Sequence, residues 1–241
     1  MPLRDHFRPR RIWQEVLGGW PAIIVQHLNS YLPNEYRAGP KVHLGSPIEV
    51  GAATDGTPVE KEDGSFVALD PKLVRPDGTV VPAPVPTLSI EAEIADFDEY
   101  EVRINDDRGR LVVAIELISS GNLDRPDSRN PFVTKCAGLL QREVALILVD
   151  LVTDRQTNLY DDLIDRIGQR DPAVTDPLPP IYAAAVRWRP IGRRGKLESW
   201  YHPLAIGGSL PELPLWLSDD LGVTVALETT YEQTLRDLRM A

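Results

Sequence analysis

The chain has 241 residues, 42% of them hydrophobic, and a formal net charge of −10 at pH 7. This length and composition predict a globular protein with a sizeable core, and we expect a single domain over residues 1–241. The acidic balance disfavours strong non-specific binding to nucleic acid, which lysine and arginine side chains drive. A basic cleft on an acidic protein would still admit that partner. The single cysteine, Cys136, excludes an internal disulfide.

No stretch approaches the length of a transmembrane helix, and the basic N-terminus is not followed by the apolar run of a secretory signal. We therefore expect a cytoplasmic protein with no membrane partner.

The first half of the chain predicts a helix, two strands and a long connection. The helix has apolar residues at a helical spacing (Ile24, Leu28, Leu32), with Pro21 at its start and Pro33 at its stop. Extended segments are expected at 41–50 and, from alternating polarity, at 87–95. Residues 54–86 between them are rich in proline and turn dipeptides, which indicates a long connection with room for a short hairpin at 65–69.

The second half of the chain alternates strands and helices. It predicts, in order, a hairpin of 100–104 with 111–118, a helix at 132–141, a strand at 145–152, a helix over 159–167 capped by Thr157, a hairpin of 181–190 with 196–204, a proline-punctuated strip at 210–217, and a last helix at 228–238. This interleaving predicts the α/β class, with a mixed β-sheet flanked by helices.

The segment Leu111–Asn122 carries the strongest chemical signal. It is an apolar, β-branched strand with one acid, Glu116, at its centre, and a buried carboxylate needs a cation or hydrogen-bond donors. Lys135 lies on the next predicted helix, and a second apolar strand follows. A strand with an internal acid, a helix with a lysine and another strand form the skeleton of a metal-dependent nuclease core. In such a core Glu116 and the carbonyl of Leu117 would ligate Mg²⁺, and Lys135 would orient the attacking water.

A second acid is needed beside Glu116, and the sequence offers weak candidates. Glu49 ends an earlier strand, but its same-face neighbour two residues on is Gly51, which has no ligating side chain. Glu91 and Glu93 share one face of a strand that could simply be solvated. Asp150 closes a strand, where an acid is more often a turn or cap residue.

Several motifs along nearly the whole chain occur together in one known family. They are MPLRDHF, GGWPAIIVQHL, YEVR, FVTKCA, HPLA, LPLWL and the C-terminal RDLR. As a set they resemble a bacterial domain-of-unknown-function family (number four-zero-five-eight), whose central segment is similar to the Uma-type relatives of the PD-(D/E)xK nucleases.

That resemblance implies a restriction-endonuclease-like core with an added C-terminal hairpin and helix. It also implies that Glu116 is a metal ligand and that Lys135 is the catalytic lysine, moved from the strand to the following helix. The chain departs from the family where E-I-D becomes Glu49-Val50-Gly51 and where S-P-S-N-K becomes residues 119–123, SSGNL.

Two functions remain open on this basis. One is a non-catalytic binding or scaffold protein, in which Glu116 and Lys135 form a structural ion pair. The other is a Mg²⁺-dependent phosphodiesterase or endonuclease that uses Glu116 and Lys135, with Glu49 as a weaker metal ligand. Gly51 and the acidic charge favour the first. No motif supports another cofactor or a different enzyme class.

Overall fold

The computed structural model describes residues 3–7, 12–43, 72–74, 80–82, 99–119, 126–155, 157–191 and 194–240. Contacts within the chain divide it into two units, one of residues 1–45 with 95–241 and one of residues 46–94. In the second unit, β2 (Lys72–Val74) and β3 (Val80–Pro82) pair antiparallel inside the predicted connection. The strand expected at 87–95 and the hairpin expected at 65–69 lie outside the described residues.

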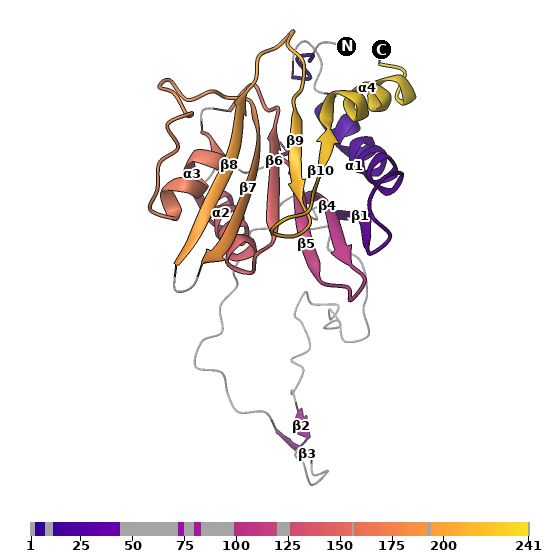
Figure 1. Cartoon of the computed structure of the whole chain (residues 1–241). Helices are drawn as coiled ribbons and strands as arrows, with labels where there is room; N and C mark the ends of the chain where they lie inside the picture. Colours follow the sequence, from indigo (N-terminus) through magenta and orange to yellow (C-terminus); the bar gives the residue numbers. More distant parts are fainter. Residues whose placement is uncertain are drawn as a thin grey trace, which may run out of the picture. The chain divides into compact units, whose positions relative to one another are not determined.

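The first unit is built around one mixed sheet of six strands (Figure 1). Its spatial order is β1 (Tyr36–His43), β4 (Glu99–Asp106), β5 (Leu111–Leu117), β6 (Ala145–Asp150), β7 (Tyr182–Ile191) and β8 (Arg194–Pro203). The β5–β6 pair is parallel and the other neighbouring pairs are antiparallel. The parallel pair requires a crossover, which α2 (Pro126–Gln141) supplies. The predicted mixed α/β class is therefore confirmed.

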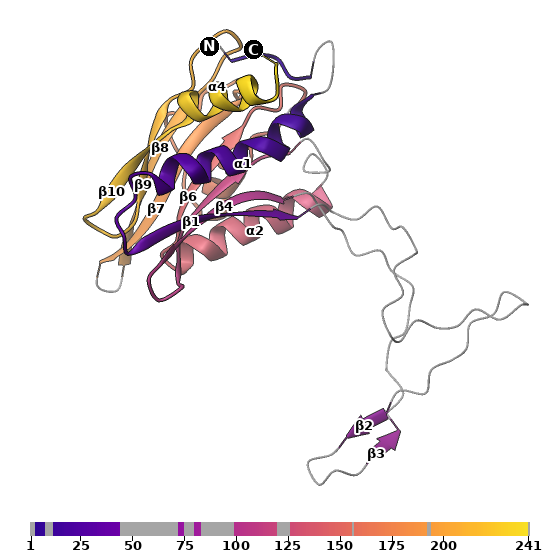
Figure 2. The same cartoon turned by 90° about the vertical axis from the view of Figure 1, so that its right-hand side faces the viewer.

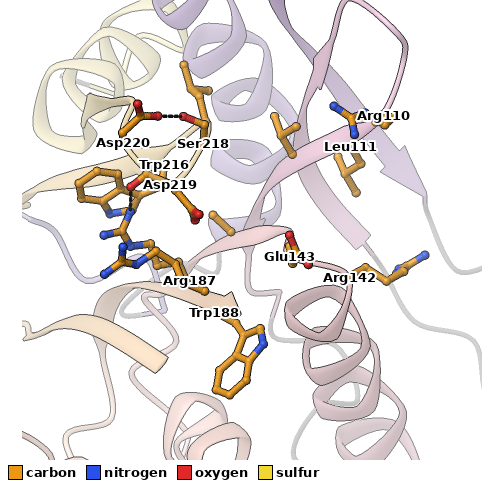
Figure 3. A pocket seen from close by; sticks show the side chains of 14 residues that line it. Arg110, Leu111, Arg142, Glu143, Arg187, Trp188, Trp216, Ser218, Asp219 and Asp220 are labelled. Atoms are coloured by element: carbon orange, nitrogen blue, oxygen red, sulfur yellow. Dashed lines mark hydrogen bonds between the residues drawn. The ribbon is translucent and has the colours of Figure 1, made fainter. Parts of the chain in front are cut away.

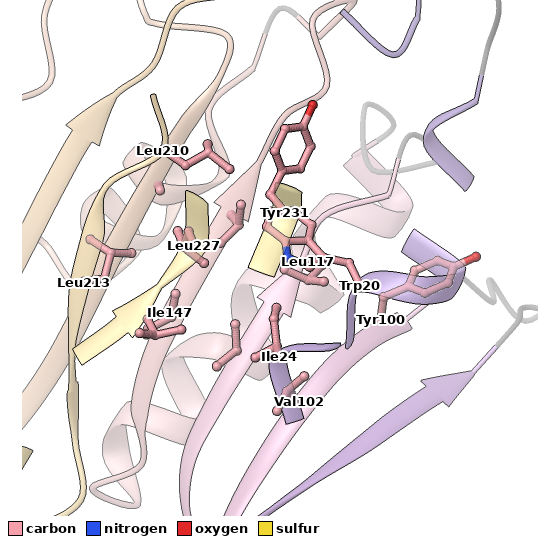
Figure 4. Close-up of a cluster of buried hydrophobic side chains, with 14 of the residues drawn as sticks. Trp20, Ile24, Tyr100, Val102, Leu117, Ile147, Leu210, Leu213, Leu227 and Tyr231 are labelled. Carbon is pink, nitrogen blue, oxygen red and sulfur yellow. The ribbon is translucent and has the colours of Figure 1, made fainter. Parts of the chain in front are cut away.

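One face of the sheet is covered by α1 (Trp13–Asn29), by α4 (Leu227–Asp237) and by the hairpin of β9 (Glu212–Trp216) with β10 (Gly222–Ala226) (Figure 2). Figure 4 shows the apolar cluster between these layers, where Trp20, Ile24 and Tyr231 meet Ile147 and Leu213. The Trp20 indole donates to Thr230 Oγ1 at 2.9 Å, so its buried N–H is satisfied.

The opposite face of the sheet packs against α2 and α3 (Leu159–Arg166). Its core joins Cys136 and Leu139 of α2 to Leu148 of β6 and Tyr160 of α3. Cys136 is thus a small core residue. The two apolar clusters lie on opposite sides of one sheet, because successive residues of each strand point to opposite faces.

Several predicted boundaries were wrong. Helix α1 begins at Trp13, so Pro21 lies inside it, because Trp13, Val16, Leu17 and Trp20 extend the buried stripe upstream. The helix ends at Asn29, whose side-chain amide binds both the N–H and the C=O of Ala38. The extended segment expected at 41–50 begins earlier, at Tyr36, and residues 44–50 lie outside the described ones.

The other differences concern a cap and a hairpin. Asn158, not Thr157, caps α3, and its side chain accepts from the N–H of Asp161 at 3.1 Å. The strip at 210–217 is half of a hairpin, because a polar turn leads from β9 to β10. The predicted hairpins β4–β5 and β7–β8 and the last helix are confirmed within a few residues.

A buried ion pair fixes the chain where it leaves β5. Arg155 Nη1 lies 2.7 Å from Asp150 Oδ2, with both side chains fully buried, and Arg155 Nη2 donates to the carbonyl of Ser119 at 2.8 Å. On the other face of the sheet, the Trp13 indole donates to the carbonyl of Ile118 at 3.0 Å. These bonds satisfy the backbone immediately beyond the strand that carries Glu116.

Among the described helices, none combines the length and the apolar character needed to cross a membrane.

We predict that Arg155→Met lowers the free energy of unfolding by about 3–5 kcal/mol, because it leaves the Asp150 carboxylate buried without its guanidinium. Urea denaturation followed by circular dichroism measures this loss. The matched control is Arg110→Met, which breaks a pair with Asp106 in which the arginine side chain is 71% exposed, and it should change stability less. Equal losses in the two variants would contradict a structural role for the buried pair.

Candidate functional site

Charged side chains form a row across one end of the sheet, on the face covered by α2. Strand pairing places Lys41 of β1 opposite Glu101 of β4, and Glu101 opposite Glu116 of β5. The same row continues through Leu148 of β6 and Ala184 of β7, both buried in the apolar core. The row therefore changes from charged to apolar between β5 and β6.

A register shift between β4 and β5 makes the two glutamates neighbours. Asn105 pairs with Leu111, but Ile104 pairs with Val113, so β5 has one extra residue, Val112, at this point. Without that residue, Glu101 would lie opposite Ile115, whose side chain belongs to the apolar core on the other face. The shift lets Val102 and Ile115 face α1 while both carboxylates face α2.

Helix α2 places Lys135 over these two acids. Lys135 Nζ lies 2.8 Å from Glu116 Oε1 and 3.4 Å from Glu101 Oε2. The side chain of Glu116 is 3% exposed and that of Lys135 is 20% exposed. The structure thus brings together the acid and the lysine that the sequence analysis paired, and it adds a second carboxylate to the pair.

Glu101 is the functional candidate that sequence reasoning missed. Its side chain is completely buried, although Glu101 and Arg103 alternate with apolar residues along β4, a pattern typical of a strand with one solvated face. Arg103, on the same face of β4, approaches Glu101 Oε1 at 2.9 Å, and Lys41 approaches Glu101 Oε2 at 3.7 Å. Its place opposite Glu116 could be inferred only with the register shift known.

The other acids considered from the sequence do not join this cluster in the described part of the chain. Asp150 pairs with Arg155 and accepts from the N–H of Val152, as a turn residue does. Glu49 and Gly51 lie outside the described residues, as do Glu91 and Glu93.

The two carboxylates could hold a divalent cation with help from water and backbone oxygen. Within the described ranges, no group of three or more His, Cys, Asp or Glu side chains is arranged to hold a metal ion. Mg²⁺ does not require such a group, because it commonly keeps several waters and takes one or two carboxylates. The hard oxygen donors of Glu101 and Glu116 therefore fit Mg²⁺ or Mn²⁺.

A separate pocket of about 490 Å³ lies at the N-terminal ends of β5 and β6 (Figure 3). The guanidinium of Arg187 lies 3.6 Å from the centre of the Trp216 ring and donates to the carbonyl of Asp219 at 3.1 Å. Arg142 and Glu143 reach the pocket from the end of α2. Its cations and acids are mixed, so its charge selects neither anions nor cations.

Near this pocket, Glu198 of β8 offers a useful comparison with the paired glutamates. Lys196 Nζ lies 2.8 Å from Glu198 Oε1, and the side chains of Arg187 and Arg189 also donate to this carboxylate. The hydrogen bond from Lys196 is the largest of the contacts that lower the pKa of Glu198 to about 2. Three cations thus surround the single acid Glu198, whereas Lys41, Arg103 and Lys135 surround two acids, Glu101 and Glu116.

We predict that Lys135→Met lowers the free energy of unfolding by about 3 kcal/mol, because two adjacent buried carboxylates lose their shared cation. Lys196→Met is the matched control, since it removes an equally short contact at a lysine side chain that is 59% exposed. It should cost less than about 1 kcal/mol. Chemical denaturation of both variants at pH 7 tests this difference, and equal losses would show that burial adds nothing to the Lys135 contact.

Comparisons with protein-family models, curated proteins and solved structures found no match. Function must therefore be inferred from the residues of the site itself.

Proposed function

We propose that this protein hydrolyses phosphodiester bonds with a divalent metal ion, using Glu101 and Glu116 as metal ligands and Lys135 as the cation beside the reacting water. The observation that carries this proposal is the position of two buried carboxylates on paired strands, with one lysine ammonium within 3.4 Å of both. In this proposal Glu101 is the second metal ligand, the role for which the sequence analysis considered Glu49 and found no side chain at Gly51.

The surrounding elements support the same proposal. The strand β5 carries Glu116, α2 presents Lys135, and β6 returns parallel to β5. This is the order of elements expected for the nuclease-like core, with the lysine on the helix, as the resemblance to the Uma-type proteins implies. Lys41, Arg103 and Lys135 lie within 3.7 Å of the glutamate oxygens and offset part of the negative charge that a metal ligand carries.

The protein groups would act by position and charge. A divalent ion on these carboxylates would polarise the scissile phosphate and lower the pKa of a bound water. Glu101 and Glu116 are held on one face of paired strands, so the relative position of the two carboxylates is set by the sheet. Lys135, whose ammonium donates to Glu101 Oε2 and lies 2.8 Å from Glu116 Oε1, can orient the attacking water and offset charge on the phosphate oxygens.

A non-catalytic binding or scaffold protein is the second candidate. The observation that favours it is the complete burial of the Glu101 side chain, with Lys41, Arg103 and Lys135 all within 3.7 Å of its oxygens. In that case the cluster serves only to attach α2 and β1 to β4 and β5. The two candidates differ in whether a divalent ion binds.

We predict Mg²⁺- or Mn²⁺-dependent cleavage of an end-labelled oligonucleotide by the wild-type chain. Glu101→Gln and Glu116→Gln should each lower the rate at least about 100-fold, because each removes an anionic ligand while keeping the shape of the side chain. Product formation is followed on denaturing gels, with circular dichroism to check that each variant is folded.

Glu198→Gln is the matched control for this assay, since it neutralises another carboxylate that is surrounded by three cations. Its cleavage rate should stay within about twofold of wild type, because it lies outside the proposed site. Loss of activity in all three variants, or in none of them, would contradict the assignment of the two ligands.

We also predict that Mn²⁺ raises the melting temperature of the wild-type chain. At 100 times the dissociation constant, binding to the folded state alone adds about 2.7 kcal/mol of stability. Glu101→Gln should abolish this shift and Glu198→Gln should keep it. A wild-type melting temperature that does not respond to Mg²⁺ or Mn²⁺ would favour the scaffold function instead.

A further inference from the structure

A surface groove runs along α2, between that helix, α3 and the β7–β8 hairpin. Two adjoining hollows form it, a deeper one of about 580 Å³ and a more open one of about 650 Å³. They share Thr134, Gly138 and Arg166, so they are continuous. Neither hollow is lined by the charged residues of the turn between β9 and β10, which line the separate pocket described above.

The charge of this groove is opposite to that of the protein. Lys135, Arg142 and Arg166 line it, and none of the described residues that line either hollow is acidic. The nearby acids of α3 (Asp161, Asp162 and Asp165) line a separate hollow. On a chain with a net charge of −10, Arg142 and Arg166 with no acid among the described lining residues indicate an anionic ligand, and Lys135 adds a third positive charge, although its ammonium also contacts Glu101 and Glu116.

Small residues keep the groove open along α2. A Cβ added to Gly138 would meet no atom within 4 Å, so nothing in the described structure fills that space. Glycine weakens the interior of a helix, so its presence here favours an open groove over a more stable helix. Ala137, another small residue, also lines the deeper hollow, as does Trp188.

Trp188 provides an aromatic surface at one end of the deeper hollow. Its ring lies directly over Gly195 of β8, where an added Cβ would stand only 2.0 Å from a ring atom. The backbone therefore supports the indole from one side while the side chain lines the groove. A ring held in this way can stack on a flat group with little loss of conformational freedom.

We infer that this groove binds single-stranded nucleic acid, with its phosphates on Lys135, Arg142 and Arg166 and a base on Trp188. Arg142 directly follows the last residue of α2, seven residues after Lys135, a rise of about 10 Å along the helix axis, which matches about three nucleotide steps of a stacked strand. A cationic track joined to an aromatic side chain is the usual form of a single-strand site. Since Lys135 also contacts Glu116, a bound strand would lead toward the proposed hydrolytic site.

Other anionic macromolecules satisfy only part of this chemistry. A duplex presents its phosphates but keeps its bases stacked, so it cannot use Trp188. An acidic peptide offers charge without a base to stack. The inference deepens the proposed function by naming its substrate class, and it rests on that function only for what happens after the strand is bound.

The test is fluorescence anisotropy of a labelled oligothymidylate of about 12 nucleotides, a length in the range of known single-strand sites. It is measured with the full chain in EDTA, so that no metal-dependent cleavage can occur. Wild type should bind the oligonucleotide, with affinity falling as salt rises. Arg142→Gln with Arg166→Gln should weaken binding about tenfold and reduce the slope of log affinity against log salt by about 1.4, for two lost contacts.

Two further variants separate shape and stacking from charge. Gly138→Leu fills the groove without changing charge and should weaken binding about tenfold, while the melting temperature holds or rises. Trp188→Leu should weaken binding by a similar factor, through the loss of one stacked base. The charge control is Arg108→Gln with Arg239→Gln, two exposed arginines outside the groove, and it should bind like wild type.

The outcomes distinguish this inference from the proposed function. Wild type that binds the strand in EDTA but does not cleave it when Mg²⁺ or Mn²⁺ is added would remove only the proposed hydrolysis. The groove assignment is overturned if wild type does not bind, if the groove variants bind like wild type, or if a duplex or polyglutamate binds as tightly as the single strand.

Discussion

Two carboxylates side by side in a sheet interior determine much of this structure. Directly opposed residues on paired strands have Cβ atoms about 5 Å apart, so the charges of Glu101 and Glu116 repel each other where little water reaches them. Lys135 offsets both charges from α2, Arg103 approaches from two residues farther along β4, and Lys41 approaches from β1. The position of α2 on the sheet is therefore tied to an electrostatic requirement as well as to its apolar contacts.

This requirement depends in turn on one extra residue in β5. The shift at Val112 lets the apolar residues of β4 and β5 face α1 while both acids face α2. A slip of one residue reverses the face of every side chain in a strand. With the shift absent, one glutamate would enter the apolar cluster around Trp20 and Ile24 (Figure 4) or Ile115 would leave it. A local irregularity near the turn thus sets the chemistry several residues away.

Among the described residues, two clusters in which several cations surround acids differ in composition and setting. Around Glu198, three cations meet one acid beside an open pocket, and the result is an ordinary surface network. Around Glu101 and Glu116, three cations meet two acids whose side chains are almost completely buried. Keeping a second acid inside the sheet is costly and unnecessary for folding alone, since apolar side chains could fill the same volume. That cost is the physical reason to assign a function to the pair.

The sequence by itself determined the elements with strong periodicity, the α/β class and the pairing of Glu116 with Lys135. These follow from local patterns, because an acid in an apolar strand needs a cation and the next helix offers one. Only the tertiary structure decided that Glu101 is the second acid, because its place opposite Glu116 depends on the register shift. It also decided that α1 continues through Pro21, since the buried contacts of Trp13 and Trp20 outweigh the hydrogen bond that proline cannot make.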